Sequence, residues 1–216
     1  MGAVKRTRAR RLSIILVRHG ETAFNRDGQG LGRAELPLTQ VGIAQANAIA
    51  ARLETLPVRR VLSSPLNRAS QIADAIASRH GIAAEPLEAL VELDVGETEG
   101  LEFAEMRRRF PDFLAAWASD DGWQARMPAG ESISDLADRL RPLVEELRTH
   151  SDGDAVIVSH NFVLRTLLCL FLDLDLSRFR SFQVDLASAT FLTVRNGRVG
   201  VASVNDTCHL VNLNLA

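Results

Sequence analysis

The chain has 216 residues, of which 46% are apolar, and this length and composition are enough for one sizeable core in one domain. Its 25 basic and 27 acidic residues give a net charge of -2, which argues against nucleic acid or an anionic membrane surface as a partner. No apolar run in the sequence reaches the roughly 20 residues that a membrane span needs.

The N-terminal segment 1–11 is basic, and we expect it to be a flexible tail before a single domain over 12–216. The apolar run that follows is too short for a secretory leader. The two cysteines, Cys169 and Cys208, are not spaced as a metal or redox pair. These features predict a cytoplasmic protein, whose oligomeric state is left open and includes a homodimer among the alternatives.

Apolar strands alternate with helical patterns in the N-terminal half. A strand at 13–17 precedes a helix with an apolar face over 46–53. A strand at 58–63 precedes a helix that is predicted to start at Ser64, with this residue as its cap and proline at the first helical position. A short strand is expected within 82–87.

The C-terminal half continues the alternation and closes with a hairpin signal. A helix over 102–118 is predicted to break at Pro111. A second helix over 133–147 opens on a capping box of Ser132 and Asp135, and Pro142 should kink it or cost it a hydrogen bond. A strand at 155–158, a buried helix over 163–171, and two strands at 190–194 and 198–204 around the turn Asn196-Gly197 follow.

This order of elements predicts an α/β fold. We expect a three-layer sandwich in which a mostly parallel central sheet carries helices on both faces and an antiparallel edge strand or hairpin. The long irregular stretch 92–131 is expected to form a lid or cap over the strand ends rather than a second domain.

Two histidines directly follow predicted strands. Arg18-His19-Gly20 ends the first strand, and His160 follows the strand at 155–158. The carboxyl edge of such a sheet is where ligands bind, so the two imidazoles are expected side by side. A histidine nitrogen can attack phosphorus, a guanidinium fork matches phosphate geometry, and Gly20 would let the backbone come close to the anion. Two histidines without paired carboxylates are weak evidence for a metal, and none is predicted.

Three motifs resemble the histidine phosphatase superfamily, which includes cofactor-dependent phosphoglycerate mutases. They are LVRHGET at 16–22, SSPLNRASQIA at 63–73 and VSHNFVLRTLL at 158–168. Further matches are PLTQVGIAQA at 37–46, ELDVGETEGL at 92–101 and PAGES at 128–132. The resemblance spans nearly the whole chain, and the motifs occur in the family's order.

The resemblance implies a role for each matching residue. His19 would be the phosphorylated nucleophile, and Glu92 the general acid that later acts as base, with Asp94 and Glu97 as rival candidates. The phosphoryl group would be bound by Arg18, Asn25, Arg68 and His160.

The activity that the resemblance implies is hydrolysis of a small phosphorylated metabolite through phosphohistidine, with neither metal nor cofactor. A phosphoglycerate mutase is the alternative, but the family's mutases usually carry a longer lid and a TGW-type stretch where this chain has GQGLG at 28–32. A binding module that has lost turnover is a third reading, which the intact residue set disfavours. The chain departs from the family at Asn161, where glycine is common, and this leaves the substrate open.

The predicted lid is rich in arginine. Arg107, Arg108, Arg109 and Arg126 are candidates for a second acidic group of the substrate, although a solvated surface is the simpler interpretation.

Overall fold

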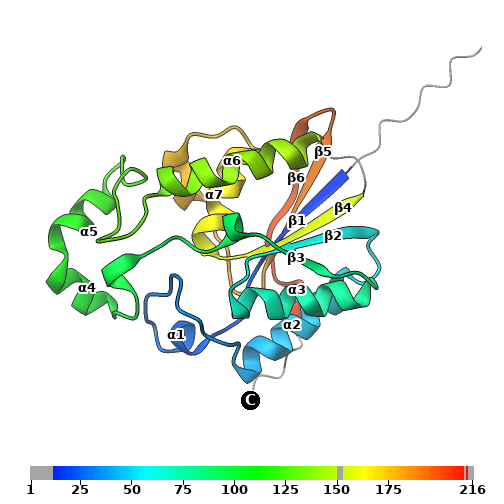
Figure 1. The fold of residues 1–216 in the computed structure, drawn as a ribbon, viewed down its shortest axis with the longest axis horizontal. Coiled ribbons are helices and arrows are strands. Elements are labelled where there is room, and N and C mark those ends of the chain that lie inside the picture. The colour runs from blue at the N-terminus through cyan, green and yellow to red at the C-terminus, as the bar shows by residue number, and fades with distance from the viewer. Residues whose placement is uncertain (1–11, 150–152, 212, 214–216) are drawn as a thin grey trace, which may run out of the picture.

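The computed structural model describes residues 12–149, 153–211 and 213, so the predicted tail 1–11 lies outside the described residues. These residues form a six-stranded sheet with the strand order β3-β2-β4-β1-β5-β6 (Figure 1). The strands are β1 (Leu12–Arg18), β2 (Val58–Ser63), β3 (Ala84–Pro86), β4 (Asp154–Ser159), β5 (Ala189–Arg195) and β6 (Arg198–Asp206).

The sheet is parallel from β3 to β1 and antiparallel at the β5-β6 edge. The predicted hairpin around Asn196-Gly197 is confirmed as β5-β6. Both residues have a positive φ, as a tight hairpin turn requires. The side chains of 14–17 in β1 are all buried, as expected of a strand that is covered on both faces.

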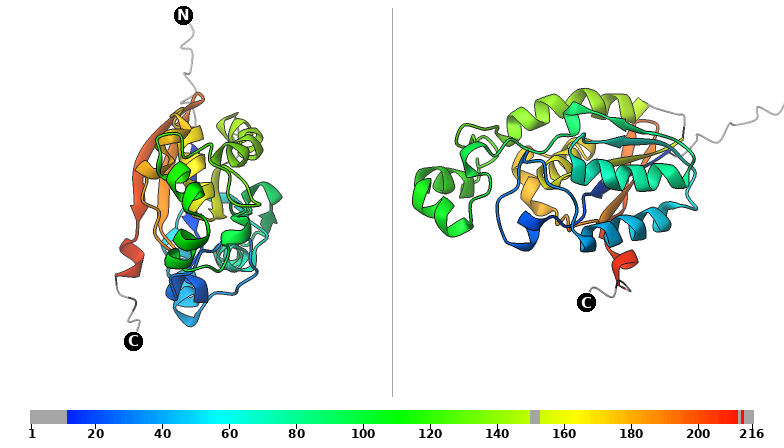
Figure 2. Two further views of the ribbon diagram at one scale, coloured as in Figure 1. Left: turned by 90° about the vertical axis from the view of Figure 1, so that its left-hand side faces the viewer. Right: turned by 60° about the horizontal axis from the view of Figure 1, so that its bottom comes forward.

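Helices cover both faces of the sheet (Figures 1 and 2). The helices are α1 (Ala23–Arg26), α2 (Gln40–Leu53), α3 (Asn67–Arg79), α4 (Phe103–Arg109), α5 (Pro111–Ala118), α6 (Ile133–Thr149) and α7 (Asn161–Phe171). One core lies beneath α6 and α7 and the other beneath α2 and α3. The predicted three-layer α/β sandwich is therefore confirmed.

Helix α6 runs from Ile133 to Thr149 as one helix through Pro142. Its start is a capping box, in which Ser132 Oγ accepts the Asp135 N–H and the Asp135 carboxylate accepts the Ser132 N–H at 2.8 Å. Pro142 lies on the exposed side of the helix. The buried stripe on the opposite side keeps the helix on the core despite the missing donor.

The predicted start of α3 at Ser64 is wrong. The helix begins at Asn67, and its N-terminal flanking residue, Leu66, makes no side-chain cap. Ser64 instead accepts the Leu66 N–H at 3.3 Å in a short turn and is fully buried. Its hydroxyl contacts a histidine of the site, and this tertiary contact outweighs the local capping preference.

Helices α4 and α5 lie at one end of the molecule, away from the sheet (Figures 1 and 2). Pro111 separates them and occupies the first position of α5, where its missing N–H costs nothing. In the part of the chain that the structure describes, no helix is both long and apolar enough to cross a membrane.

Candidate active site

Three strands end side by side at the carboxyl edge of the sheet. Arg18 of β1 pairs with Ser159 of β4, and Ser63 of β2 pairs with Val158. The next residues along these strands are His19, His160 and Ser64, so register alone brings them together. The two imidazole rings lie with centroids 5.2 Å apart.

His19 is held in a defined orientation. It is 2% exposed, and its Nδ1 lies 2.7 Å from the carbonyl oxygen of Gly20. Because a carbonyl can only accept, Nδ1 carries the proton and Nε2 carries the lone pair. Among the described residues Nε2 has no hydrogen-bond partner. Burial, with the charges of Arg18 and Arg68, keeps the pKa of His19 well below its usual value, so Nε2 stays unprotonated and nucleophilic.

His160 is fully buried beside His19, and Ser64 fixes its ring. His160 Nε2 lies 2.8 Å from Ser64 Oγ. Since Oγ already accepts the Leu66 N–H, its own proton is free to be donated to Nε2. Nδ1 then carries a proton, and this buried atom has no partner in the described part of the chain. Nδ1 is therefore a donor available to an oxygen of a bound anion.

Two arginines stand beside the histidines, Arg68 fully buried and Arg18 half-buried. Arg68 donates to the carbonyl oxygens of Gly32 at 2.6 Å and Ala34 at 2.8 Å, and Arg18 donates to that of Val184 at 2.7 Å. Burial lowers the pKa of Arg18 to about 10 and also lowers that of Arg68, yet both remain charged at neutral pH. These backbone contacts fix the two guanidinium groups in place.

The Nε atoms of Arg18 and Arg68 are buried and have no acceptor among the residues described. Together with His160 Nδ1 they make three unpaired donors around His19. A buried donor without a partner carries a free-energy cost that an anion would remove. The arrangement is typical of a site for a phosphoryl group.

Asn25 lies on the loop side of the same site. Its Oδ1 accepts the backbone N–H of Thr22 at 3.1 Å and the Thr22 hydroxyl at 2.9 Å. The amide oxygen of Asn25 thus points back to Thr22, the N-cap of its own helix α1, and the amide NH₂ is left as a donor. Asn25 and Arg18 both line a cavity of about 640 Å³. The cavity is also lined by Asp185, Leu186, Thr207, Leu210 and Val211.

Glu92 is 3% exposed, and its carboxylate lies at the N-terminus of α7. It accepts the backbone N–H groups of Leu93 at 2.8 Å, Phe162 at 3.2 Å and Val163 at 3.3 Å. Burial raises the pKa of Glu92, while these hydrogen bonds and the charges of Arg68 and Arg18 oppose the rise. A carboxyl whose pKa is moved toward neutrality suits acid–base work.

The two rival candidates for the general acid, Asp94 and Glu97, are more exposed than Glu92. Asp94 is half-buried and pairs with Arg33 at 3.3 Å. Glu97 is exposed and lies 3.9 Å from Arg109. Glu92 acts on the pKa of both Arg18 and Arg68, and neither Asp94 nor Glu97 does. The geometry favours Glu92.

Gly20 is needed for packing. A Cβ at this position would lie 2.9 Å from the carbonyl oxygen of Gly42 in the first turn of α2, and one at Gly42 would lie 2.3 Å from that of Glu21. The two glycines let α2 approach the backbone that follows His19.

Three residues near the site were not predicted from the sequence. Ser64 orients His160. Arg139 of α6 donates to the carbonyl oxygens of Val91 at 2.6 Å and Glu92 at 3.2 Å and so positions the Glu92 loop. Arg165 lies on α7, one turn after the amides that bind Glu92. The sequence does indicate a place in the site for Ser64, because this residue directly follows a strand, as the two histidines do.

Replacing Ser64 by alanine tests its positioning role. We expect kcat/KM to fall about tenfold, because one hydrogen bond that fixes the His160 tautomer is lost. The matched control is Ser63→Ala, since the Ser63 hydroxyl donates to the Ser64 carbonyl at 2.8 Å and makes no hydrogen bond to His160. Steady-state kinetics and thermal melting of both variants would decide. Equal losses of activity would contradict the role.

The fold and this site together define a class of enzyme that acts on phosphate esters. A family model described as the histidine phosphatase superfamily (branch 1) matches residues 14–207, and the chain belongs to that superfamily. It is an enzyme of the phosphatase type, and mutases occur in the same family.

Relatives and solved structures agree with this assignment. Phosphoserine phosphatase 1 of Hydrogenobacter thermophilus is 30% identical over 92% of this chain and 94% of its own length. The probable phosphoglycerate mutase GpmB of Proteus mirabilis is 31% identical over 94% of this chain and 97% of its own. The structure of a mycobacterial glucosyl-3-phosphoglycerate phosphatase superposes with a TM-score of 0.82 at 26% identity, covering 92% of this chain and all of that one.

Proposed function

We propose that this protein hydrolyses small phosphomonoesters through a phosphohistidine on His19, without a metal ion. The observation that carries the proposal is the set of buried, unpaired donors of Arg18, Arg68 and His160 around an unprotonated Nε2.

In the first step, the lone pair of His19 Nε2 forms a bond to phosphorus while the ester P–O bond breaks. The Glu92 carboxyl gives its proton to the departing oxygen, which leaves as an alcohol. Arg18, Arg68, Asn25 and His160 stabilise the charge on the other oxygens. Nδ1 keeps its proton and its hydrogen bond to Gly20 throughout.

In the second step, a water molecule attacks the phosphorus, and the Glu92 carboxylate takes one of its protons. The P–N bond breaks, its electron pair returns to Nε2, and inorganic phosphate leaves. Glu92 is protonated again and ready for the next ester. A mutase would instead have to keep water from the phosphohistidine.

The substrate class that we propose is a phosphomonoester with a second anionic group. Arg165 is half-buried on α7, and its guanidinium has no acceptor among the residues of 12–149 and 153–211. It is close enough to Arg18 to lower the pKa of that group. Arg165 makes no ion pair among the described residues, although the charges of Glu92 and Asp185 act on it from further away. A guanidinium next to another cation, with no carboxylate in direct contact, favours binding of an anion. The names of two relatives, for phosphoserine and for glucosyl-3-phosphoglycerate, fit this class.

The arginines of the predicted lid have partners of their own. Arg107 lies over the Phe103 ring, Arg108 pairs with Glu105, and Arg126 pairs with Asp135 at 2.8 Å. We therefore favour Arg165 over them as the group that selects the substrate. That 92–131 acts as a lid over a single domain is also part of the proposal.

The test compares Arg165→Gln with wild type on phosphoserine and on p-nitrophenyl phosphate, in EDTA. We expect kcat/KM for phosphoserine to fall about 10- to 100-fold, mostly in KM, because a charge-assisted hydrogen bond is lost. The aryl ester should be affected by less than about threefold, since it has no second anion. Arg126→Gln is the matched control and should change neither. An equal loss on both esters would overturn the assignment to Arg165 but not the phosphatase reaction.

We further propose that the enzyme is cytoplasmic and acts on a small molecule. Both cysteines are free thiols, Cys169 buried and Cys208 exposed, which suits a reducing cytoplasm. The near-neutral charge supports a small-molecule substrate rather than nucleic acid. A homodimer is left for solution measurement.

A further inference from the structure

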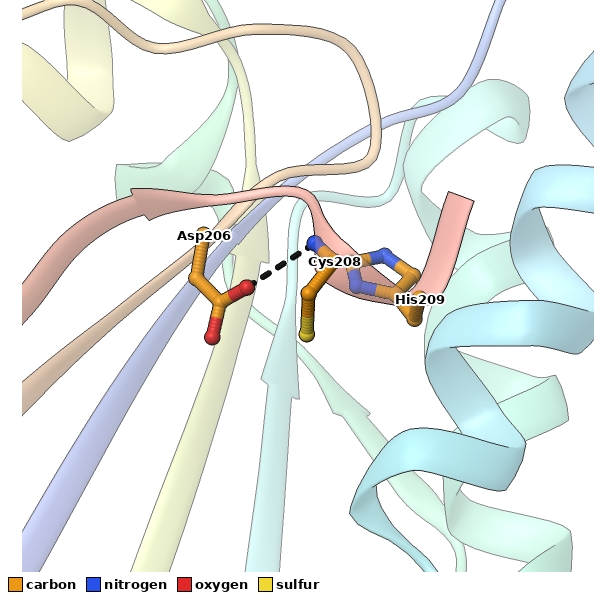
Figure 3. A group of neighbouring side chains, drawn as sticks. All are labelled: Asp206, Cys208 and His209. Atoms are coloured by element: carbon orange, nitrogen blue, oxygen red, sulfur yellow. Dashed lines mark hydrogen bonds between the residues drawn. The ribbon is translucent and has the colours of Figure 1, made fainter. Parts of the chain in front are cut away.

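A second cluster of reactive side chains lies where β6 ends. Asp206, Cys208 and His209 place a carboxylate oxygen, a sulfur and an imidazole nitrogen within 4.8 Å of one another (Figure 3). Among the described residues, no other group of three His, Cys, Asp or Glu side chains has its ligand atoms this close together. Thiolate, imidazole and carboxylate together are a donor set that suits Zn²⁺.

His209 is oriented as a metal ligand would be. Its Nε2 lies 2.9 Å from the carbonyl oxygen of Ala187, so Nε2 carries the proton and Nδ1 the lone pair. Nδ1 is buried and has no hydrogen-bond partner among the described residues. Histidines that bind metals almost always donate their other N–H to a carboxylate, a backbone carbonyl or water, and this fixes the ring. The ring of His209 is therefore already fixed, with the Nδ1 lone pair free to bind a metal ion.

Of the other two ligands, Asp206 is oriented and Cys208 is free to rotate. Asp206 Oδ1 accepts the backbone N–H of Cys208 at 3.0 Å, which orients the carboxylate, and Cys208 is exposed. Bonds of about 2.0–2.3 Å to a tetrahedral ion place ligand atoms about 3.3–3.8 Å apart. The cluster must contract by about 1.5 Å at most. Rotation of the exposed Cys208 side chain can supply much of this movement.

One charge opposes a cation here. The Arg52 guanidinium lies 3.8 Å from Asp206 Oδ2, and the two side chains are 40% and 22% exposed. A pair this long and this exposed is worth little, so it does not block binding. Replacing Arg52 therefore provides a variant that should bind a cation more tightly rather than less tightly.

We propose that Asp206, Cys208 and His209 bind one zinc-type divalent ion, with a fourth position open to solvent, at the rim of the cavity that Arg18 and Asn25 line. Thr207, Leu210 and Val211, which flank these ligands, line the same cavity as Arg18 and Asn25. The ion takes no part in the phosphoryl transfer proposed above.

A short hydrogen-bond path joins this ion site to the nucleophile. Ala187, whose carbonyl holds His209, donates its own N–H to the carbonyl oxygen of His19 at 3.0 Å. Ala187 has a positive φ of 54°, a conformation that its two partners help to hold. Binding of the ion thus stabilises both the pocket wall and the backbone at His19.

The test is titration of the reduced full-length protein with Co²⁺ and then Zn²⁺, followed by absorption. We expect one Co²⁺ per chain with a thiolate-to-cobalt charge-transfer band that Zn²⁺ abolishes. Cys208→Ser should lose the band, because the remaining cysteine, Cys169, is buried in the core. His209→Gln should weaken Zn²⁺ binding at least about tenfold, since glutamine can keep the contact to Ala187 but supplies no Nδ1.

Two further variants sharpen the result. Arg52→Gln should tighten binding several-fold, because it removes the opposing charge. His80→Gln removes a histidine at the end of α3, outside the cluster, and should leave binding unchanged. Melting curves in EDTA show whether each variant is folded. The proposal fails if the wild-type protein binds no ion at micromolar concentration, if the band survives in Cys208→Ser, or if folded His209→Gln binds as tightly as wild type. None of these outcomes depends on phosphatase turnover.

Discussion

The His19→Ala protein is expected to lose turnover by roughly three orders of magnitude or more, because the atom that forms the bond to phosphorus is removed. The loss should appear in kcat for every ester, whatever its leaving group, and should be the same with and without EDTA. Release of inorganic phosphate from p-nitrophenyl phosphate measures it.

The control for His19→Ala is binding of inorganic phosphate. Arg18, Arg68 and His160 are held by contacts to Val184, to the 32–34 loop and to Ser64, and none of these contacts is to the His19 side chain. The variant should therefore still bind phosphate, measured by calorimetry, within about tenfold of wild type. Retained turnover in this variant would contradict a histidine nucleophile.

The Glu92→Gln protein is expected to lose about 10²- to 10⁴-fold in turnover of an alkyl phosphate, because the alkoxide must then leave without a proton. With p-nitrophenyl phosphate, whose leaving group is stable as an anion, the first step should survive. Rapid mixing should then show a burst of nitrophenol close to one per active site, followed by slow hydrolysis of the phosphohistidine. A variant with equal losses on both esters and no burst would show that Glu92 is not the acid.

The pH profile follows from the same two groups. Attack requires unprotonated His19, and the low pKa of His19 moves the acidic limb of kcat/KM well below the usual histidine range. Proton donation requires protonated Glu92, and its raised pKa moves the basic limb above the usual glutamate range. In Glu92→Gln the basic limb should disappear. A profile of the variant with the wild-type basic limb would assign that limb to another group.

Much of the site could be predicted because its residues follow strands. The apolar runs before His19 and His160 identify two strands, and parallel pairing brings strand ends to one edge. The same reasoning applied to Ser64 would have placed it beside His160. Its polar side chain before a proline also favours a helix cap, and that local preference is overridden by the tertiary contact with His160.

Glu92 and Arg165 could not be placed by periodicity. Glu92 lies in an irregular stretch, and its burial depends on amides of α7 that are 70 and 71 residues further along the chain. Its assignment came from the family resemblance. Arg165 interrupts a mostly apolar helix. Whether its guanidinium has a hydrogen-bond acceptor depends on which loops pack around α7, and periodicity does not show that.

The direct test of the account is to find where the phosphoryl group is held during turnover. Glu92→Gln protein is mixed with p-nitrophenyl phosphate, quenched in alkali to preserve phosphohistidine, digested and analysed by mass spectrometry. The account predicts one phosphoryl group on the peptide that contains His19, and none when His19→Ala is combined with Glu92→Gln. A phosphoryl group on His160, or turnover without any phosphorylated peptide, would contradict it.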